Sequence, residues 1–477
     1  MPHYALGLLD ILTAALFIFF SFQQFKKNNF QFSALLLVVA AFVLRAFVAS
    51  DLYLHEWDER YHALVAKNLM DNFLVPKLYS IPLLPYSVSD WSSNYIWLHK
   101  QPLPLWCMAI SMKIFGVNEW ALRFPSVCIS SIGVYLTYFI GKQLFSEKVG
   151  LLGAFFHCIN GLMIEMTGGR IATDHIDVFF FFFVELGVAF SIVVFKEKKR
   201  YLNVIVGVCI GLAVLSKWLP AFTVALVWLI LNYESKALGR TALGLALVVL
   251  TSLAVFLPWQ LYAHSTFPLE YASEMQHNYR HIIETLDGRE GGPFYFFNKL
   301  FITLNEFIWI AFAWFIYKAF QKSNSRNRLA LAIWILIPFI FFSIAKTKMQ
   351  GYLLFVYPAL FIVLAEFCLF LLEKKADSKR WKFQQLIVIV LVFLSVRYSI
   401  ERIKPFQDQS KQLTWANEFR KLEKQGAEKK VYLNVRHCIE GMFYTNSIMY
   451  GYMPTSEQIE EMKAKGYEII VNQNPEL

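Results

Sequence analysis

The chain has 477 residues, of which 17% are charged and 57% are hydrophobic, and its formal net charge is +10. An average soluble domain is about 25% charged, so this composition excludes an ordinary soluble protein, a disordered protein and a small disulfide scaffold, and leaves an integral membrane protein. In a membrane protein an excess of Lys and Arg first reports orientation, so we expect no nucleic-acid partner.

Twelve apolar stretches are long enough, or nearly so, to cross the hydrocarbon core of a bilayer. We expect helices at 5–22, 32–49, 121–141, 149–166, 176–195, 201–216, 218–233, 241–262, 294–317, 329–345, 352–373 and 383–400. A further apolar stretch at 103–116 has only 14 residues, with Pro102 and Pro104 at its start, so we interpret it as an interfacial or re-entrant helix. The predicted fold class is an all-α polytopic membrane protein.

Charges alternate along the chain and predict the orientation of the spans. Every second loop is basic, and six such loops together hold 19 Lys or Arg residues, at 26–27, 142–148, 196–200, 236–240, 318–328 and 374–382. By the positive-inside rule these loops are cytoplasmic, and both termini then lie outside.

The predicted outer side is larger and more varied. It has a long first loop at 50–120, shorter loops at 167–175, 263–293 and 346–351, and a C-terminal region at 401–477. In that region 431–435 and 468–471 are typical of strands, and Thr455 with Gln458 is a candidate capping box at the start of a helix. We therefore expect a transmembrane domain at 1–400 and a small soluble α/β region at 401–477, outside the membrane.

The first outer loop carries two sets of reactive side chains. Asp58 and Glu59 precede a stretch whose apolar spacing is typical of a helix lying on the membrane. They either stabilise the start of this helix through its dipole or supply a catalytic carboxylate base at the bilayer edge. Lys100, followed by Gln101 and Pro102, is either a snorkelling side chain or a ligand for a lipid phosphate.

Charged residues recur in the later outer loops. Arg170 and Asp174 are four residues apart, so we expect them on one helix face, either as a local ion pair or as part of the site. Lys217 and Lys348 lie at outer ends of spans, against the positive-inside trend, and an anionic phosphate is a natural ligand for them.

Histidines in the outer loops are candidate metal ligands. His277 and His281 are spaced i, i+4, Glu274 lies three residues before His277, and His99 precedes Lys100. This arrangement can hold zinc, although solvated interfacial histidines are the simpler interpretation. We expect no required cofactor, with a divalent metal as the alternative.

The order of these motifs resembles the GT-C membrane glycosyltransferases. Asp-Glu in the first outer loop is followed by His-Lys-x-Pro-x-Pro, Gly-Leu-Leu-Gly-Ala at 150–154, Arg-x-x-x-Asp, Ser-Lys-x-x-Pro at 216–220 and Lys-x-Lys-x-x-x-Tyr-Leu-Leu at 346–354. Over residues 32–400 the sequence is most similar to the bacterial branch related to protein O-mannosyltransferases and 4-amino-4-deoxy-L-arabinose lipid A transferase. It departs from that branch in an extra N-terminal span and in Gln101, where relatives commonly have proline.

This resemblance implies an enzyme that transfers a sugar, with inversion, from a polyprenyl-phosphate carrier to an acceptor on the outer face. It implies that Asp58 is the base that deprotonates the acceptor, with Glu59 as its neighbour, and that Lys100 binds the donor phosphate. Other matched positions are Arg170 with Asp174 as a second acidic site, Lys348 and Tyr352 as contacts with the phosphate or the sugar, and His277 with an open role. We expect a monomeric bacterial inner-membrane enzyme with its site on the periplasmic or extracytoplasmic face.

Several alternatives stay open. The acceptor could be lipid A, another glycolipid, a glycan or a protein. A secondary transporter or lipid flippase would suit twelve spans and the acidic residues Glu185 and Glu366 within them. An O-antigen ligase or polymerase would use a lipid diphosphate as its donor instead of a monophosphate.

Overall fold

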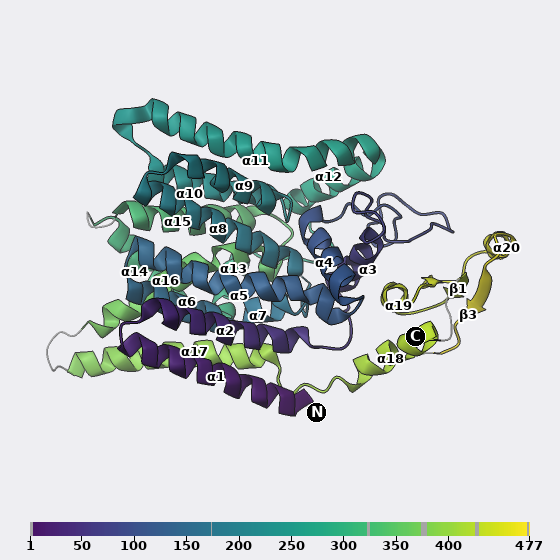
Figure 1. Cartoon of the computed structure of the whole chain (residues 1–477), viewed down its shortest axis with the longest axis horizontal. Coiled ribbons are helices and arrows are strands. Elements are labelled where there is room, and N and C mark those ends of the chain that lie inside the picture. Colours follow the sequence, from purple (N-terminus) through teal and green to yellow (C-terminus); the bar gives the residue numbers. More distant parts are fainter. Residues whose placement is uncertain (1–2, 173, 322–324, 374–378, 425–428, 475–476) are drawn as a thin grey trace.

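The computed structural model describes residues 3–172, 174–321, 325–373, 379–424, 429–474 and 477. A helical bundle makes up most of the molecule, and short helices, long loops and a small α/β unit gather at one end, here called the loop end (Figure 1). The α-helices are α1 (His3–Lys26), α2 (Phe30–Ala49), α3 (Asp58–Leu69), α4 (Pro102–Phe115), α5 (Glu119–Leu144), α6 (Glu147–Ile159), α7 (Gly161–Thr167), α8 (His175–Glu197), α9 (Asn203–Val214), α10 (Thr223–Asn232), α11 (Leu238–Thr266), α12 (Pro268–Ile283), α13 (Tyr295–Thr303), α14 (Ile308–Ala319), α15 (Ser325–Ile344), α16 (Tyr357–Leu372), α17 (Lys379–Ile403), α18 (Ser410–Lys424), α19 (Cys438–Tyr444) and α20 (Ser456–Ala464). The 3₁₀ helices are η1 (Arg200–Leu202), η2 (Leu219–Phe222), η3 (Ser235–Ala237) and η4 (Gln350–Val356), and the strands are β1 (Lys430–Leu433), β2 (Ile448–Met449) and β3 (Glu468–Val471).

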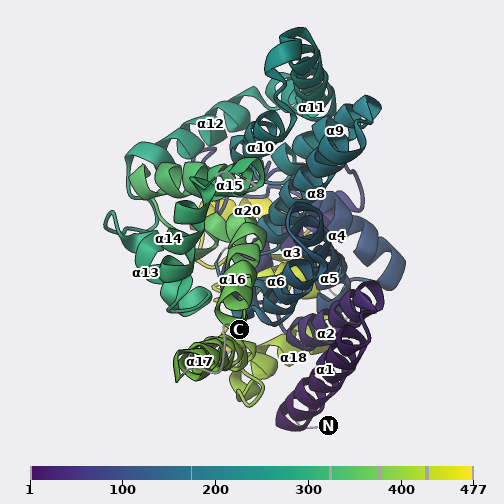
Figure 2. The same ribbon diagram turned by 90° about the vertical axis from the view of Figure 1, so that its left-hand side faces the viewer.

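All twelve predicted stretches are helical, and the protein is a multi-pass membrane protein. Within the described ranges seven helices are long and apolar enough to cross a membrane, or nine if each of two bent pairs is one span. The most buried of them contains α16, which lies near the middle of the bundle in the view of Figure 2. The stretches at 201–216 and 218–233 differ from the prediction of full spans, because α9 and α10 have only 12 and 10 residues and a turn around Lys217 with η2 separates them.

Two predicted spans are broken, and an Asn side chain satisfies backbone groups at each break. The axes of α6 and α7 differ by 52°, and those of α13 and α14 by 107°. Asn160 accepts a hydrogen bond from the Met163 N–H (3.1 Å) and donates to the Thr303 carbonyl (2.8 Å). Asn305 donates to the Leu391 carbonyl (2.8 Å). Internal partners of this kind are required where irregular backbone lies at membrane depth.

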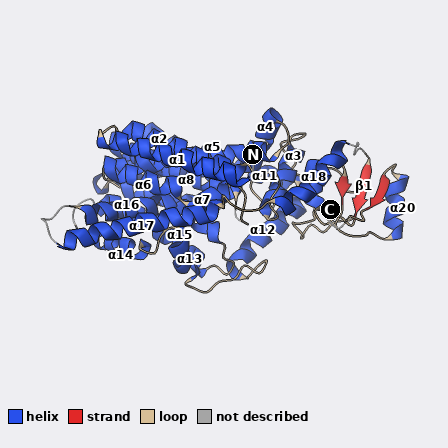
Figure 3. Cartoon of the chain, turned by 90° about the horizontal axis from the view of Figure 1, so that it is seen from below, coloured by secondary structure: helices blue, strands red, loops and turns tan. Residues whose placement is uncertain are grey.

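The C-terminal unit, residues 404–477, is the small α/β region that the sequence predicts. Its three parallel strands have the order β2-β1-β3, with Val431 paired to Ile448 on one side and Ile469 on the other. All strands of the described chain lie in this unit (Figure 3). The strand at 468–471 and the capping box of Thr455 and Gln458 are confirmed, and α18, α19 and β2 are additional to the prediction.

The C-terminal unit and the loop at 50–120 share one hydrophobic core. The loop supplies side chains from α3, α4 and the segment between them, and the unit supplies side chains from α18, α19 and its sheet. Buried members include Tyr61, Leu64, Leu69, Trp97 and Leu105 from the loop, and Trp415, Phe419, Val431, Phe443 and Met449 from the unit. Because burial of apolar surface is the main source of stability, the two segments stabilise each other.

Candidate active site

Asp58 is the first residue of α3, and it faces Lys100. Two acidic residues in the first turn favour a helix start here, because they lie at the positive end of the helix dipole. The Nζ of Lys100 lies 3.2 Å from Oδ2 of Asp58, and each side chain is 23% exposed, so a ligand can reach the pair. Burial disfavours the charged form of Lys100, but the Asp58 carboxylate outweighs it and holds the pKa of Lys100 above its ordinary value. Lys100 is therefore a cation at neutral pH.

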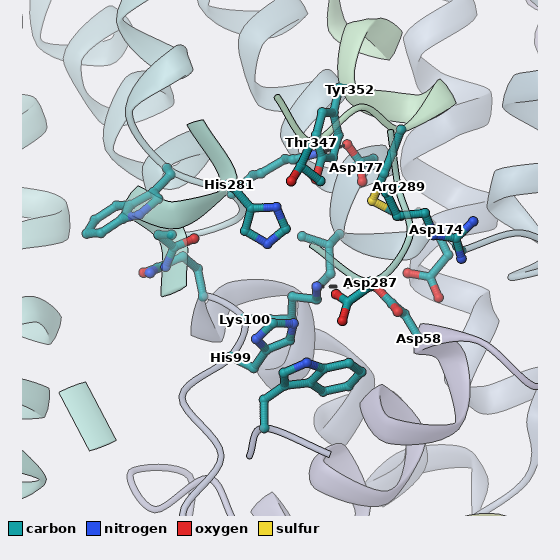
Figure 4. Close-up of a pocket in the computed structure, with 18 of the residues that line it drawn as sticks. Asp58, His99, Lys100, Asp174, Asp177, His281, Asp287, Arg289, Thr347 and Tyr352 are labelled. Atoms are coloured by element: carbon teal, nitrogen blue, oxygen red, sulfur yellow. Dashed lines mark hydrogen bonds and ion pairs between the residues drawn. The ribbon is translucent and has the colours of Figure 1, made fainter. Parts of the chain in front are cut away.

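A cavity of about 680 Å³ lies beside this pair at the loop end of the bundle (Figure 4). Its charged lining residues include Asp58, Lys100, Asp174, Asp177, Lys217, Asp287 and Arg289. Its apolar lining includes Leu219, Pro220, Ile282, Phe341 and Phe342. Leu219 is 58% exposed and Phe341 is 44% exposed, so the apolar lining continues onto the outside of the bundle. Such a cavity, with cations and carboxylates beside an apolar wall, suits an amphiphilic ligand with a polar head.

Two further cations line the cavity. Lys217, in the turn before η2, forms an ion pair with Asp177 in α8, and its Nζ lies 4.4 Å from the ring centroid of Tyr352 in η4. Arg289 lies with its guanidinium 4.6 Å from the ring centroid of Trp57, the residue before Asp58. The structure thus brings together Lys100, Lys217 and Tyr352, which the sequence places far apart, and adds Arg289.

Glu59, predicted as a catalytic neighbour of Asp58, belongs to a buried ion pair. Its side chain is 0% exposed and accepts from both Nε (2.7 Å) and Nη2 (2.9 Å) of Arg123 in α5. It also accepts from the His55 N–H (2.8 Å), and its Oε1 lies 3.1 Å from Nε2 of His175. Burial alone would raise the pKa of Glu59, but Arg123 outweighs it and holds that pKa well below its usual range. Glu59 is not among the described cavity-lining residues, so its observed contacts are structural.

The partner of Arg170 also differs from the prediction. It does not share a helix face with Asp174, because α7 ends at Thr167 and the chain reverses at Gly169, whose φ is +74°. Its guanidinium instead binds both carboxylate oxygens of Asp51, at 2.8 and 3.0 Å. Burial opposes the charged form of Asp51, but Arg170 and His55 lower its pKa below the usual range. Arg170 therefore joins two loops at the loop end and is not among the described residues that line the cavity.

Asp174 lines the cavity from the residue before α8. Its carboxylate is 0% exposed, and Oδ1 lies 3.1 Å from Nδ1 of His62 in α3. His62 is equally buried and packs edge-on against Trp97, with ring centroids 5.9 Å apart. Asp58 and Asp174 thus line one cavity from two segments that are far apart in the sequence.

The sequence is similar to known proteins over part of its length. A sequence model of the family described as dolichyl-phosphate-mannose-protein mannosyltransferase matches residues 99–262. A relative from Pseudomonas fluorescens, named undecaprenyl phosphate-alpha-4-amino-4-deoxy-L-arabinose arabinosyl transferase 2, is 24% identical over 279 residues, which are 56% of this chain and 49% of the relative. The chain thus spans about half the length of the curated relatives it matches.

Solved structures extend the likeness to nearly the whole chain. ArnT from Cupriavidus metallidurans bound to undecaprenyl phosphate matches with a TM-score of 0.62 and 16% identity, covering 92% of this chain and 89% of that one. The oligosaccharyltransferase of Archaeoglobus fulgidus matches with a TM-score of 0.58 and 14% identity, covering 87% and 64%. The fold is that of the GT-C membrane glycosyltransferases.

Lys348, predicted as a contact with the phosphate or the sugar, bonds to the backbone of a neighbouring segment of this fold. Lys348 donates from Nζ to the Gly291 carbonyl (3.1 Å), whereas its neighbours Thr347 and Met349 line the cavity. Lys348 thus ties the 346–351 loop to the 284–293 segment.

The histidines predicted as metal ligands do gather at the cavity. Nε2 of His277 and Nε2 of His281 are 3.2 Å apart in α12, and Nδ1 of His99 lies 3.2 Å from Oε2 of Glu274. His99 and His281 line the cavity. The described residues contain no group of three or more His, Cys, Asp or Glu placed to hold a metal ion.

Several residues at or near the cavity could not be predicted from the sequence. Asp287 and Arg289 flank Gly288 in a turn, where Asp287 has a φ of +52° and Gly288 one of +66°. Asp-Gly is a turn signal, so this segment was recognisable as a tight turn, but nothing local indicates that the turn points into a cavity. Asp51 and His62 likewise gain their roles from partners far away in the sequence.

Proposed function

We propose that this protein is an inverting membrane glycosyltransferase that moves a sugar from a polyprenyl-phosphate donor to an acceptor at the outer face of the bacterial inner membrane. The observation that carries the proposal is the Asp58–Lys100 pair, which places a carboxylate base and a cation 3.2 Å apart on the wall of a part-apolar cavity. A base for the acceptor and a cation for the leaving phosphate are the two groups that such a transfer needs.

The transfer follows as a single displacement. The Asp58 carboxylate takes the proton from an acceptor hydroxyl. The electron pair left on the acceptor oxygen then forms a bond to the anomeric carbon. The bond between that carbon and the phosphate oxygen breaks, and its electrons leave on the polyprenyl phosphate. Lys100 stabilises this charge, with Lys217 and Arg289 in the same cavity as further cations. The anomeric configuration is inverted because the transfer is a single displacement, without a covalent intermediate on a carboxylate.

The apolar lining supports a lipid-linked donor. Leu219, Phe341 and Ile282 line the cavity and are each more than 40% exposed on the bundle, where the polyprenyl chain would pass into the bilayer. The similar ArnT was solved bound to undecaprenyl phosphate, which supports the same class of carrier here. The basic loops 142–148, 196–200 and 236–240 support a cytoplasmic opposite side, and hence a periplasmic cavity.

The function is tested with the full-length protein in nanodiscs, a polyprenyl-phosphate sugar and a panel of candidate acceptors. Asp58→Asn should lower turnover by about 10²–10⁴-fold, the usual contribution of a general base. Lys100→Met should lower it by about 10²–10³-fold, and nuclear magnetic resonance of the product should show inverted anomeric configuration. Transfer at wild-type rates by both variants would refute the residue assignment.

Two other results would refute the function itself. A requirement for a lipid diphosphate donor would indicate a ligase or polymerase. Lipid or solute flux across vesicles that is abolished by Glu185→Gln, without any transfer, would indicate a transporter. Envelope lipids and glycoproteins of a deletion strain, compared by mass spectrometry, would identify the acceptor.

A further inference from the structure

The C-terminal unit contacts α3 close to where α3 ends. The Nζ of Lys67 donates to three carbonyls at the end of α19, those of Met442 (2.9 Å), Phe443 (3.0 Å) and Thr445 (2.7 Å). The last carbonyls of a helix have no partner within the helix and lie at the negative end of its dipole. An ammonium group has three N–H donors, and here all three have a carbonyl.

A second contact lies close to Asp58 itself. Nη1 of Arg60 lies 3.3 Å from Oε1 of Glu440 in α19, and Glu440 is 0% exposed. The same oxygen lies 3.5 Å from Nδ1 of His437. Arg60 also lines the cavity, two residues after Asp58. The C-terminal unit therefore reaches the cavity wall through Arg60.

A third set of contacts holds the segment that leads into α3. The hydroxyl of Tyr444 accepts from the Leu54 N–H (3.1 Å) and donates to Glu119 at the start of α5 (2.5 Å). Arg420 in α18 donates to the Leu52 carbonyl (2.7 Å) and to the same Glu119 carboxylate (2.5 Å). The chain before Asp58 is thus held between the bundle and the C-terminal unit.

We propose that the C-terminal unit positions α3, so that Lys67, Glu440 and Tyr444 are positioning residues for Asp58. The inference rests on the proposed function for its effect on turnover, but the contacts themselves can be tested without it. Arg123 in α5 holds Glu59, and Asp174 pairs with His62. The C-terminal unit contacts the chain just before α3, at Leu52 and Leu54, and α3 itself at Arg60 and Lys67. A shift of about 1 Å between Asp58 and Lys100 would lower turnover by roughly 100-fold.

The test uses full-length protein in nanodiscs and two independent readouts. In Lys67→Met, hydrogen–deuterium exchange of residues 51–69 should become faster while α8 and α16 stay protected. The kcat should fall by roughly 10- to 100-fold, with the KM for the lipid donor unchanged. Lys67→Arg, which keeps a cation with several N–H donors, should restore much of both. Lys463→Met, on the exposed face of α20, is the matched control and should match the wild type.

Tyr444→Phe is the milder second variant, because it removes one hydroxyl and leaves the shared core intact. It keeps the proposal falsifiable if Lys67→Met fails to fold. Unchanged exchange of residues 51–69 in Tyr444→Phe, and in Lys67→Met where it folds, would overturn the proposal. Faster exchange of 51–69 in a protein whose wild type transfers no sugar would support the positioning role while refuting the proposed function. Faster exchange with an unchanged kcat would refute the link to Asp58.

Discussion

Glu59→Gln is the substitution that best separates the two neighbouring acids of α3. Glu59 receives four hydrogen bonds, two on each carboxylate oxygen, and Arg123 contributes one to each. A glutamine amide has one oxygen and one NH₂ group, so in either orientation its NH₂ group faces two donors. Arg123 then keeps its charge in a fully buried site but loses the carboxylate that is bonded to it. Removing one partner of a buried ion pair costs about 3–5 kcal/mol, and we expect a loss of this size in the free energy of unfolding.

The assay is thermal unfolding of detergent-solubilised protein, with Asp58→Asn measured beside it. Asp58 is partly exposed, so Asp58→Asn should change stability by less than about 1 kcal/mol while abolishing most turnover. Glu460→Gln, whose side chain is 70% exposed, is a control for removal of a surface carboxylate. The reasoning fails if Glu59→Gln unfolds at the wild-type temperature and loses turnover as Asp58→Asn does, because Glu59 would then be a reacting group.

Three further predictions concern other parts of the chain. Asn160→Ala removes a helix cap and a partner of the Thr303 carbonyl at the first broken span, so it should cost about 1–3 kcal/mol in thermal unfolding with no change in donor KM. Burial raises the pKa of Glu274 to about 6, so the folded state binds the proton more tightly than the unfolded state does. The protonated carboxyl therefore adds about 2 kcal/mol to the free energy of unfolding below pH 4.5, and this gain is lost as the pH rises through 6. Thermal unfolding at pH 4.5 and 7 should show this decrease in the wild type and a smaller one in Glu274→Gln. Lys217→Met should lower turnover by about 100-fold in the transfer assay, and Lys217→Arg should recover part of it.

The helices and the capping box could be predicted because their signals are local or repeated. A long apolar run has to be mainly helical in a bilayer whatever it packs against, and the predicted stretches are helical even where the helix is broken. The capping box of Thr455 depends only on residues three apart. The resemblance in motif order implies roles for Asp58 and Lys100 in one reaction, but their contact follows from the packing of α3 against α4.

The partners of the buried charges could not be predicted, because they depend on how loops cross. Spacing alone favoured a pair between Arg170 and Asp174, but Gly169 turns the chain with a positive φ. A Cβ atom at Gly169 would lie 2.2 Å from Oε1 of Glu59, so the glycine also makes room for the buried carboxylate. Arg170 is thereby directed to Asp51, more than a hundred residues earlier, and no local pattern indicates that choice.

The location of the ionisable groups favours chemistry at the loop end over transport through the bundle. Glu185 is fully buried and accepts from Thr137 (2.5 Å), whose hydroxyl lies 2.8 Å from Nδ1 of His157. All three side chains are fully buried, and none of them is among the described residues that line the cavity beside Asp58 and Lys100. A transport path needs polar groups that a substrate can reach near the middle of the membrane. The charged residues that line the cavity instead lie in loops and near helix ends, as Asp58 and Lys100 do, where the proposed donor phosphate and acceptor would meet.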